Sequence, residues 1–143
     1  MQPDEIAYRS DRQYRTILIV WLVFMISLSA FFVFCLVVAP SATDQDLSSF
    51  GILFVAFGFI FVVDSFLWKH KFSVRAMKQH DPSLVDKAYL VAFAMCEGAG
   101  LLGVFLRFET VFRYYYVSFA LAGVAMLLHF PWKNHVLAAY EVE

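Results

Sequence analysis

Charged residues are scarce in this sequence: Asp, Glu, Lys and Arg make up 16% of its 143 residues, whereas hydrophobic residues make up 62%. A soluble domain of this size would leave much of that apolar surface in contact with water. The net charge of −1 also gives no basic field, so we expect no nucleic-acid partner. Most of the chain is therefore expected to lie in a lipid bilayer.

Catalytic and cofactor-binding motifs are missing too. The sequence has no glycine-rich phosphate loop, no HExxH helix, no CxxC pair and no nucleophile elbow. Its two cysteines, Cys35 and Cys96, lie in apolar runs at different expected depths, which disfavours a disulfide between them. We therefore expect a protein that is not an enzyme and that has no cofactor and no metal site.

Histidine is the remaining source of reactive or ligating side chains. The four histidines, His70, His80, His129 and His135, all fall at or beyond one end of the apolar runs. Their spacing fits no familiar set of metal ligands, so we expect them to be solvated or interfacial. A haem site that bridges helices is one alternative, and an enzyme that acts on lipid through these histidines is another.

Four apolar runs are present, at residues 17–39, 50–68, 88–106 and 111–130. Each has about the 20 residues that a helix needs to cross roughly 30 Å of hydrocarbon. The alternation of a barrel strand is absent, and a helix satisfies its own backbone hydrogen bonds in lipid. We therefore predict an all-α membrane protein: a single transmembrane domain, residues 1–143, that forms a four-helix bundle with helices at about 17–39, 50–68, 82–106 and 111–130. The first run is too long for a signal peptide and is expected to remain as an anchor.

The connection between the second and third runs contains a helix start. Asp81 is suited to the N-cap position, and Pro82 to the first helical position, where its missing N–H does no harm. The preceding residues 69–79 contain neither Gly nor Pro and are basic, which favours the C-terminal end of a helix. We expect the second helix to continue through this stretch, past the membrane.

Lys and Arg are unevenly divided between the two ends of the apolar runs. Of the eleven, only Arg107 and Arg113 flank one side, and the other nine flank the opposite side. Because cytoplasmic loops are enriched in basic residues, we predict that both termini are cytoplasmic. The predicted location is the inner (plasma) membrane, crossed several times.

Glu97 is the one acidic residue near the centre of a predicted span. An ionised carboxylate there would cost at least ~2.5–3.5 kcal/mol, so the side chain must be protonated, paired or facing water. A neutral Glu97 that donates a hydrogen bond is the simplest state. Counted from the inner ends of the spans, Ser27 and Ser29 lie at the same depth and are its expected partners.

Small residues surround Glu97 on the same helix. They form rows that would let neighbouring helices approach closely, and they comprise Ala92, Cys96, Ala99, Gly100 and Gly103. We expect this third helix to be the packing helix, with the phenylalanine-rich first and second helices facing lipid. The predicted function is a small membrane subunit that assembles with itself or with other membrane chains through this Gly/Ala-rich helix.

Two interpretations of Glu97 remain open. In one, its carboxyl group is structural and fixes the register of helices through a hydrogen bond. In the other, it binds and releases a proton or a sodium ion, and the chain is an ion-translocating unit. Asp64 is a weaker candidate, because it lies about one turn from the cytoplasmic end of its span and is expected to be an interfacial charge.

The stretch LVAFAMCEGAGLLGVF at residues 90–105 resembles the carboxylate helix of the ATP synthase c-subunit (proteolipid) family. The resemblance implies that Glu97 stands where that family binds its ion. The second span, with only Gly51 and Gly58, is bulkier than the family's glycine-rich inner helix. The Arg-rich start and the His-Phe-Pro end of the apolar region are also similar to small, uncharacterised bacterial proteins with four transmembrane helices.

Overall fold

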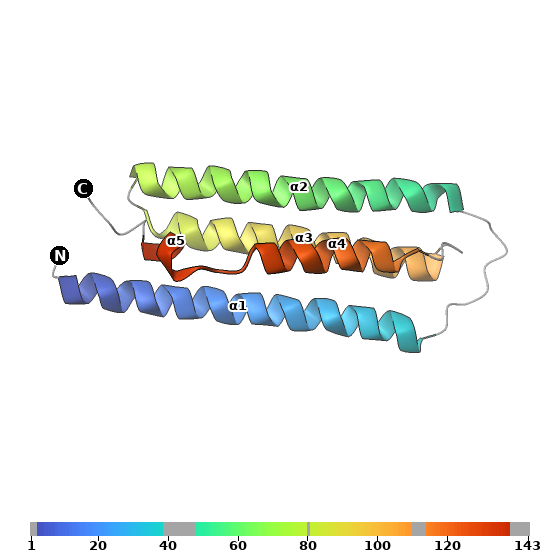
Figure 1. Ribbon diagram of the computed structural model, residues 1–143, viewed down its shortest axis with the longest axis horizontal. Coiled ribbons are helices and arrows are strands. Elements are labelled where there is room, and N and C mark those ends of the chain that lie inside the picture. The colour runs from blue at the N-terminus through green and yellow to red at the C-terminus, as the bar shows by residue number, and fades with distance from the viewer. Residues whose placement is uncertain (1–2, 39–47, 80, 110–113, 138–143) are drawn as a thin grey trace.

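The computed structural model is all-helical and describes residues 3–38, 48–79, 81–109 and 114–137. The helices are α1 (Pro3–Val37), α2 (Ser48–Gln79), α3 (Ser83–Glu109), α4 (Tyr116–Leu128) and the short α5 (Lys133–Leu137). Figure 1 shows the four longer helices side by side along one axis, with the start of α1, the turn from α2 to α3, and α5 all at the same end of the bundle. This end carries most of the basic residues and is called the basic end below.

Three of these helices are long and apolar enough to cross a membrane, over residues 7–37, 50–79 and 83–108. The fourth apolar helix, α4, has only 13 residues, which at about 1.5 Å per residue is close to 20 Å. The described part of the chain therefore has three candidate spans and one shorter apolar helix. The predicted fourth helix at 111–130 is longer than α4: residues 114, 115, 129 and 130 are not helical. Residues 111–113 lie outside the described part of the chain.

Pro131 explains why α4 stops before the basic end. Proline has no backbone N–H and clashes with the carbonyl four residues earlier, and it restricts the residue before it. The ordinary helical bond from the N–H of His129 to the oxygen of Ala125, at 2.9 Å, is still made. The next carbonyls have other partners. The oxygen of Leu127 accepts from the N–H of Phe130, only three residues on, at 3.1 Å. The oxygen of Met126 accepts from the indole N–H of Trp21 at 2.9 Å.

The helix α3 is the interior helix of the bundle. In its most apolar window 44% of the residues are buried, against 11% for α1 and 22% for α2. It contacts α1, α2 and α4, whereas α1 and α2 share their contacts mainly with α3 and α4. Large apolar side chains on the outer faces of α1 and α2 are exposed, among them Ile19, Val23, Ile26, Ile52, Leu53 and Phe59. So much exposed apolar surface is that of a protein in contact with lipid.

Polar contacts close the basic end. The Asp81 carboxylate accepts from the N–H of Ser83 at 3.0 Å, which caps the start of α3 as predicted from the sequence. Gln13 of α1 donates to the oxygen of Pro82 at 2.7 Å and to the carboxylate of Asp86 at 2.9 Å. The second helix continues to Gln79, well beyond the apolar run, as residues 69–79 led us to expect.

Candidate functional site

Glu97 lies near the middle of α3 and is only partly buried. Its Oε1 accepts a hydrogen bond from the hydroxyl of Ser27 on α1, with 2.5 Å between the two oxygens. The pair therefore joins two candidate spans at the depth where lipid offers no hydrogen-bonding group. A carboxyl group has about four acceptor positions, so one hydroxyl satisfies only part of its capacity.

Glu97 lies at the border between a buried and an exposed face of α3. Of the residues one turn away from it, Phe93 and Gly100 are buried, whereas Ala94 and Leu101 are exposed. Among the described residues, no Lys, Arg or His lies within ion-pair distance of the carboxyl group. Arg107, ten residues further along α3, donates instead to the oxygen of Cys35 at 3.0 Å and lies over the ring of Tyr115, 5.2 Å from its centroid.

The second expected partner of Glu97 lies elsewhere. The hydroxyl of Ser29 donates to the main-chain oxygen of Met25, at 2.8 Å, and its side chain is exposed. The structure thus brings Glu97 together with Ser27 and not with Ser29. Asp64 is half-buried on α2 and makes no ion pair with a described residue.

The small residues of α3 are occupied by contacts within the chain. All five are buried: Ala92, Cys96, Ala99, Gly100 and Gly103. A Cβ added at Gly100 would collide with the Leu28 side chain of α1. One added at Gly103 would come within 2.8 Å of the Phe119 ring and 3.1 Å of the Tyr115 carbonyl oxygen. In this structure these residues pack helices of the same chain against one another. Assembly with another chain through them stays a prediction.

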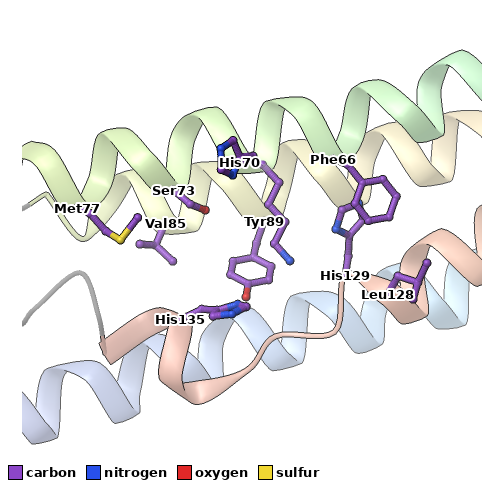
Figure 2. Close-up of a pocket in the computed structure, with 10 residues that line it drawn as sticks. Phe66, His70, Ser73, Met77, Val85, Tyr89, Leu128, His129 and His135 are labelled. Atoms are coloured by element: carbon purple, nitrogen blue, oxygen red, sulfur yellow. The ribbon is translucent and has the colours of Figure 1, made fainter.

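A cavity of about 380 Å³ opens near the basic end of the bundle, between α2, α3 and the segment that joins α4 to α5 (Figure 2). We call it the basic-end cavity. It is lined by Phe66, Lys69, His70, Ser73, Met77, Val85, Tyr89, Leu128, His129 and His135. Its volume lies within the ~300–1,000 Å³ that is usual for ligand pockets. Nothing in the spacing of these residues along the sequence revealed the cavity, because they come from four helical segments.

His129 is the clearest departure from the sequence-based expectation. We expected a solvated or interfacial side chain, but the structure buries it completely. Its Nε2 lies 2.8 Å from the hydroxyl of Ser65, and its ring packs on Phe66 with 4.2 Å between ring centroids. Its Nδ1 is buried with no hydrogen-bond partner. By contrast, His70 and His135 are exposed, and His80 lies outside the described residues.

The tautomer of His129 follows from the bonds of Ser65. The Ser65 hydroxyl has one hydrogen and donates it to the oxygen of Val62, at 2.6 Å. The 2.8 Å contact then requires the imidazole to donate from Nε2 to the serine oxygen. A neutral His129 consequently presents the bare lone pair of Nδ1 as an acceptor.

Lys69 brings the positive charge into the basic-end cavity. The side chain is half-buried, and its ammonium group lies 4.2 Å from the centroid of the Tyr89 ring. Within the described ranges, no Asp or Glu forms an ion pair with it. The aromatic face partly offsets the loss of water around the ammonium group, but it does not neutralise the charge.

The cysteines are free, as predicted, and both are buried. Cys96 lies next to the Ser65–His129 pair, with its sulfur 3.8 Å from the Ser65 hydroxyl. Within the described part of the chain, no three His, Cys, Asp or Glu side chains are close enough together to hold a metal ion.

Comparison with known proteins gives no match: no family model, no curated protein and no solved structure matches the chain. The resemblance of residues 90–105 to the proteolipid carboxylate helix stays a prediction from those residues. The site has to be interpreted from its own geometry.

Proposed function

We propose that this chain is a small multi-span membrane subunit, without catalytic activity of its own, that associates with other membrane chains or with copies of itself at the edge marked by Ser27 and Glu97. The basic end, with its nine Lys and Arg residues, faces the cytoplasm in this proposal, and both termini lie there. The proposed contact surface is the exposed border of α3 beside Glu97, next to Ala94 and Leu101, and not its buried small-residue face.

One observation carries the proposal: a partly buried carboxyl group at mid-span has one hydroxyl as its hydrogen-bond partner among the described residues. Acyl chains cannot satisfy its remaining hydrogen-bonding capacity, whereas a polar side chain on a neighbouring helix can. The exposed side chain of Ala94 is small and leaves room for such a helix one turn away. Polar contacts of this kind contribute about 0.6–2 kcal/mol between membrane helices.

Association can be tested in native membranes with tagged full-length protein. The partner chains that co-purify with the wild type, or the homo-oligomer measured by photobleaching after reconstitution, should be lost with Glu97→Leu. They should be kept with Glu97→Gln, because the amide retains the hydrogen bonds of the acid. Asp64→Leu on α2 is the matched control and should change nothing.

A second function is favoured by the same pair. A carboxyl group that carries a proton or a sodium ion needs a nearby oxygen as a partner, and the Ser27 hydroxyl supplies one at 2.5 Å. In this case Glu97→Gln should abolish ion movement across reconstituted vesicles while the assembly stays intact. Unchanged flux in Glu97→Gln would rule the ion-carrying function out, and loss of assembly in Glu97→Gln would contradict the structural one.

A further inference from the structure

The polar residues of the basic-end cavity lie in a short belt between two apolar ends. Along α2 the lining runs from Phe66 through Lys69 and Ser73 to Met77, at spacings of three and four residues that keep these side chains on one face of the helix. From Lys69 to Ser73 the belt covers about 6 Å of the helix axis. Figure 2 shows Phe66 and Met77 at opposite ends of the cavity, with Ser73 between them. The belt therefore suits one compact polar group and not an extended headgroup.

Lys69 gives the belt its charge. Its side chain is half-buried, and its ammonium group lies 4.2 Å from the centroid of the Tyr89 ring. No Asp or Glu of the described residues forms an ion pair with it. A half-buried ammonium group at the edge of hydrocarbon is stabilised by an anion that accepts its hydrogen bonds. The ligand should therefore carry a negative charge at the level of Lys69.

Further hydrogen-bonding side chains line the same belt. Ser73 lies one turn after Lys69 on α2, and His70 and His135 line the cavity from α2 and α5. A serine hydroxyl or an imidazole N–H can donate to an anionic oxygen. The belt can thus supply more than one donor to a single small anion.

The membrane end of the cavity is open to an acyl chain. Phe66 and Leu128 line this end, and both side chains are exposed (Figure 2). His129 lies beside them with its ring packed on Phe66, and its Nε2 is engaged with Ser65. Lys69 follows Phe66 by one turn of α2. A chain that leaves Lys69 on this side passes over aromatic and apolar surface into the bilayer.

The opposite end of the cavity limits the polar part of the ligand. Met77 and Val85 line this end. A substituent that continued beyond the anionic group would place its own polar atoms against these apolar side chains, where they would lose hydrogen bonds to water. The anionic group of the ligand should therefore be terminal.

We propose that the basic-end cavity binds a free long-chain fatty acid, with its terminal carboxylate at Lys69 and Ser73 and its acyl chain leaving past Phe66 and Leu128. A carboxylate carries one negative charge, is compact enough for the belt and has no group beyond it. Lys69 directly follows the apolar run at residues 50–68, so the carboxylate would lie at the membrane interface. This site is separate from the Glu97 edge, so its test is independent of the proposed function.

Binding is measured on the full chain, purified in a neutral detergent at mildly alkaline pH, by native mass spectrometry with three ligands that share one acyl chain. Oleate has the terminal carboxylate, methyl oleate has no charge, and dioleoyl phosphatidylglycerol has a charge that is followed by a glycerol group. The wild type should bind oleate about tenfold more tightly than either of the others. Equal affinity for methyl oleate would show that charge plays no part, and equal affinity for phosphatidylglycerol would show that the anion need not be terminal. Either result would overturn the proposal.

Lys69→Gln tests the anion contact. It should weaken oleate about tenfold, the loss that follows from removing one charge-assisted hydrogen bond, and should leave methyl oleate unchanged. Lys71→Gln is the matched control, because Lys71 lies over the Trp68 ring at 4.7 Å and does not line the cavity. Equal losses of oleate in the two variants would reduce the attraction to a general surface effect and would refute the site.

Leu128→Trp tests the acyl path. The larger ring should narrow the membrane end of the cavity and weaken oleate, whereas Leu127→Trp should not, because Leu127 is exposed but does not line the cavity. Unchanged oleate binding in Leu128→Trp would overturn the path. Displacement of oleate by an equal concentration of butyrate, which has the carboxylate without the long chain, would overturn the assignment to a lipid. Far-UV circular dichroism and a melting curve of each variant show that it is folded.

Discussion

Trp21 of α1 donates its indole N–H to the carbonyl oxygen of Met126 in α4, at 2.9 Å. This carbonyl belongs to the last turn of α4. In a continuing helix it would accept from the N–H of Phe130, the residue before Pro131, which donates to the oxygen of Leu127 instead. A side chain of one helix therefore caps a carbonyl at the end of another. The contact also fixes the relative height of the two helices in the bundle.

Replacing Trp21 by Phe should destabilise the protein by about 1–3 kcal/mol, because the Met126 oxygen is left without a partner in a region that water reaches poorly. Thermal or denaturant unfolding in detergent, followed by circular dichroism, measures the loss. Trp132→Phe is a suitable control, since the side chain of Trp132 is exposed. Equal losses for the two variants would show that the indole hydrogen bond has no special weight.

The close approach of α3 and α4 at Gly103 predicts a steric effect. Gly103→Ala places a methyl group 2.8 Å from the Phe119 ring and 3.1 Å from a backbone oxygen, neither of which can move away easily. We expect a loss of about 1–3 kcal/mol from overpacking. Gly123→Ala in α4 meets no atom within 4 Å and should leave stability unchanged or slightly raised. A stable Gly103→Ala variant would mean that the two helices are further apart than described.

Carbodiimide labelling distinguishes the states of Glu97. A hydrophobic carbodiimide reacts with protonated carboxyl groups that it can reach from lipid, so a neutral Glu97 on the partly exposed face of α3 should be modified. Glu97→Gln should abolish the labelling, and Asp64→Asn should not, which peptide mass spectrometry can establish. Protection by sodium ions would indicate that sodium binds at Glu97, whereas labelling at every sodium concentration would exclude sodium.

The orientation of the chain can be read from cysteine accessibility. Tyr114 and Lys133 are exposed near opposite ends of the bundle, before and after α4. In intact cells, a membrane-impermeant maleimide should label Tyr114→Cys and leave Lys133→Cys unlabelled until the membrane is broken. The native cysteines are fully buried and provide an unlabelled background. Labelling of both positions in intact cells would show that the segment with α4 does not cross the membrane.

The Asp81 cap should give a pH dependence at the turn from α2 to α3. The hydrogen bonds from Ser83 lower the pKa of Asp81 below its usual value, because they favour the charged carboxylate. A lowered pKa in the folded state means that the stabilisation is fully present above the unfolded value of ~3.9 and is lost as the pH falls through the folded value. Asp81→Asn keeps a capping side chain that does not titrate.

The difference in melting temperature between wild type and Asp81→Asn should accordingly be constant at neutral pH and should change only in the acid range. A difference that changes between pH 6 and pH 8 would assign the effect to another group, since an aspartate with a lowered pKa does not titrate there.

The apolar runs were sufficient to predict the helical class and three of the spans, because the length and composition of a lipid-exposed helix are dictated by the bilayer. They placed the end of the fourth helix at residue 130, two residues beyond the end of α4, since a hydropathy average does not register that Pro131 interrupts the helical hydrogen bonds. They underestimated α1, which begins at Pro3 and not near Ile17. The apolar run marks only the part of a helix that lipid surrounds, and polar residues continue α1 beyond it.

The expected depth of each residue in the membrane identified two possible partners of Glu97, of which only Ser27 bonds to it. Ser27 and Ser29 lie at nearly the same depth, but two residues correspond to about 200° around a helix, so both cannot face α3. The burial of His129 could not be predicted either. Its partner Ser65 is 64 residues away in the sequence, and only the packing of α2 against the end of α4 brings the two together.

The polar contacts of α1 also set an order for biogenesis. Ser27 finds its partner 70 residues later in the chain and Trp21 finds its partner 105 residues later. At translation rates of ~5–20 residues per second, the first helix waits roughly 5–20 s in the bilayer before the last helix emerges. The Ser27 hydroxyl lacks its partner until α3 is made, and the Trp21 indole lacks its partner until α4 is made, so α1 reaches its full set of contacts only when the last helix is in place.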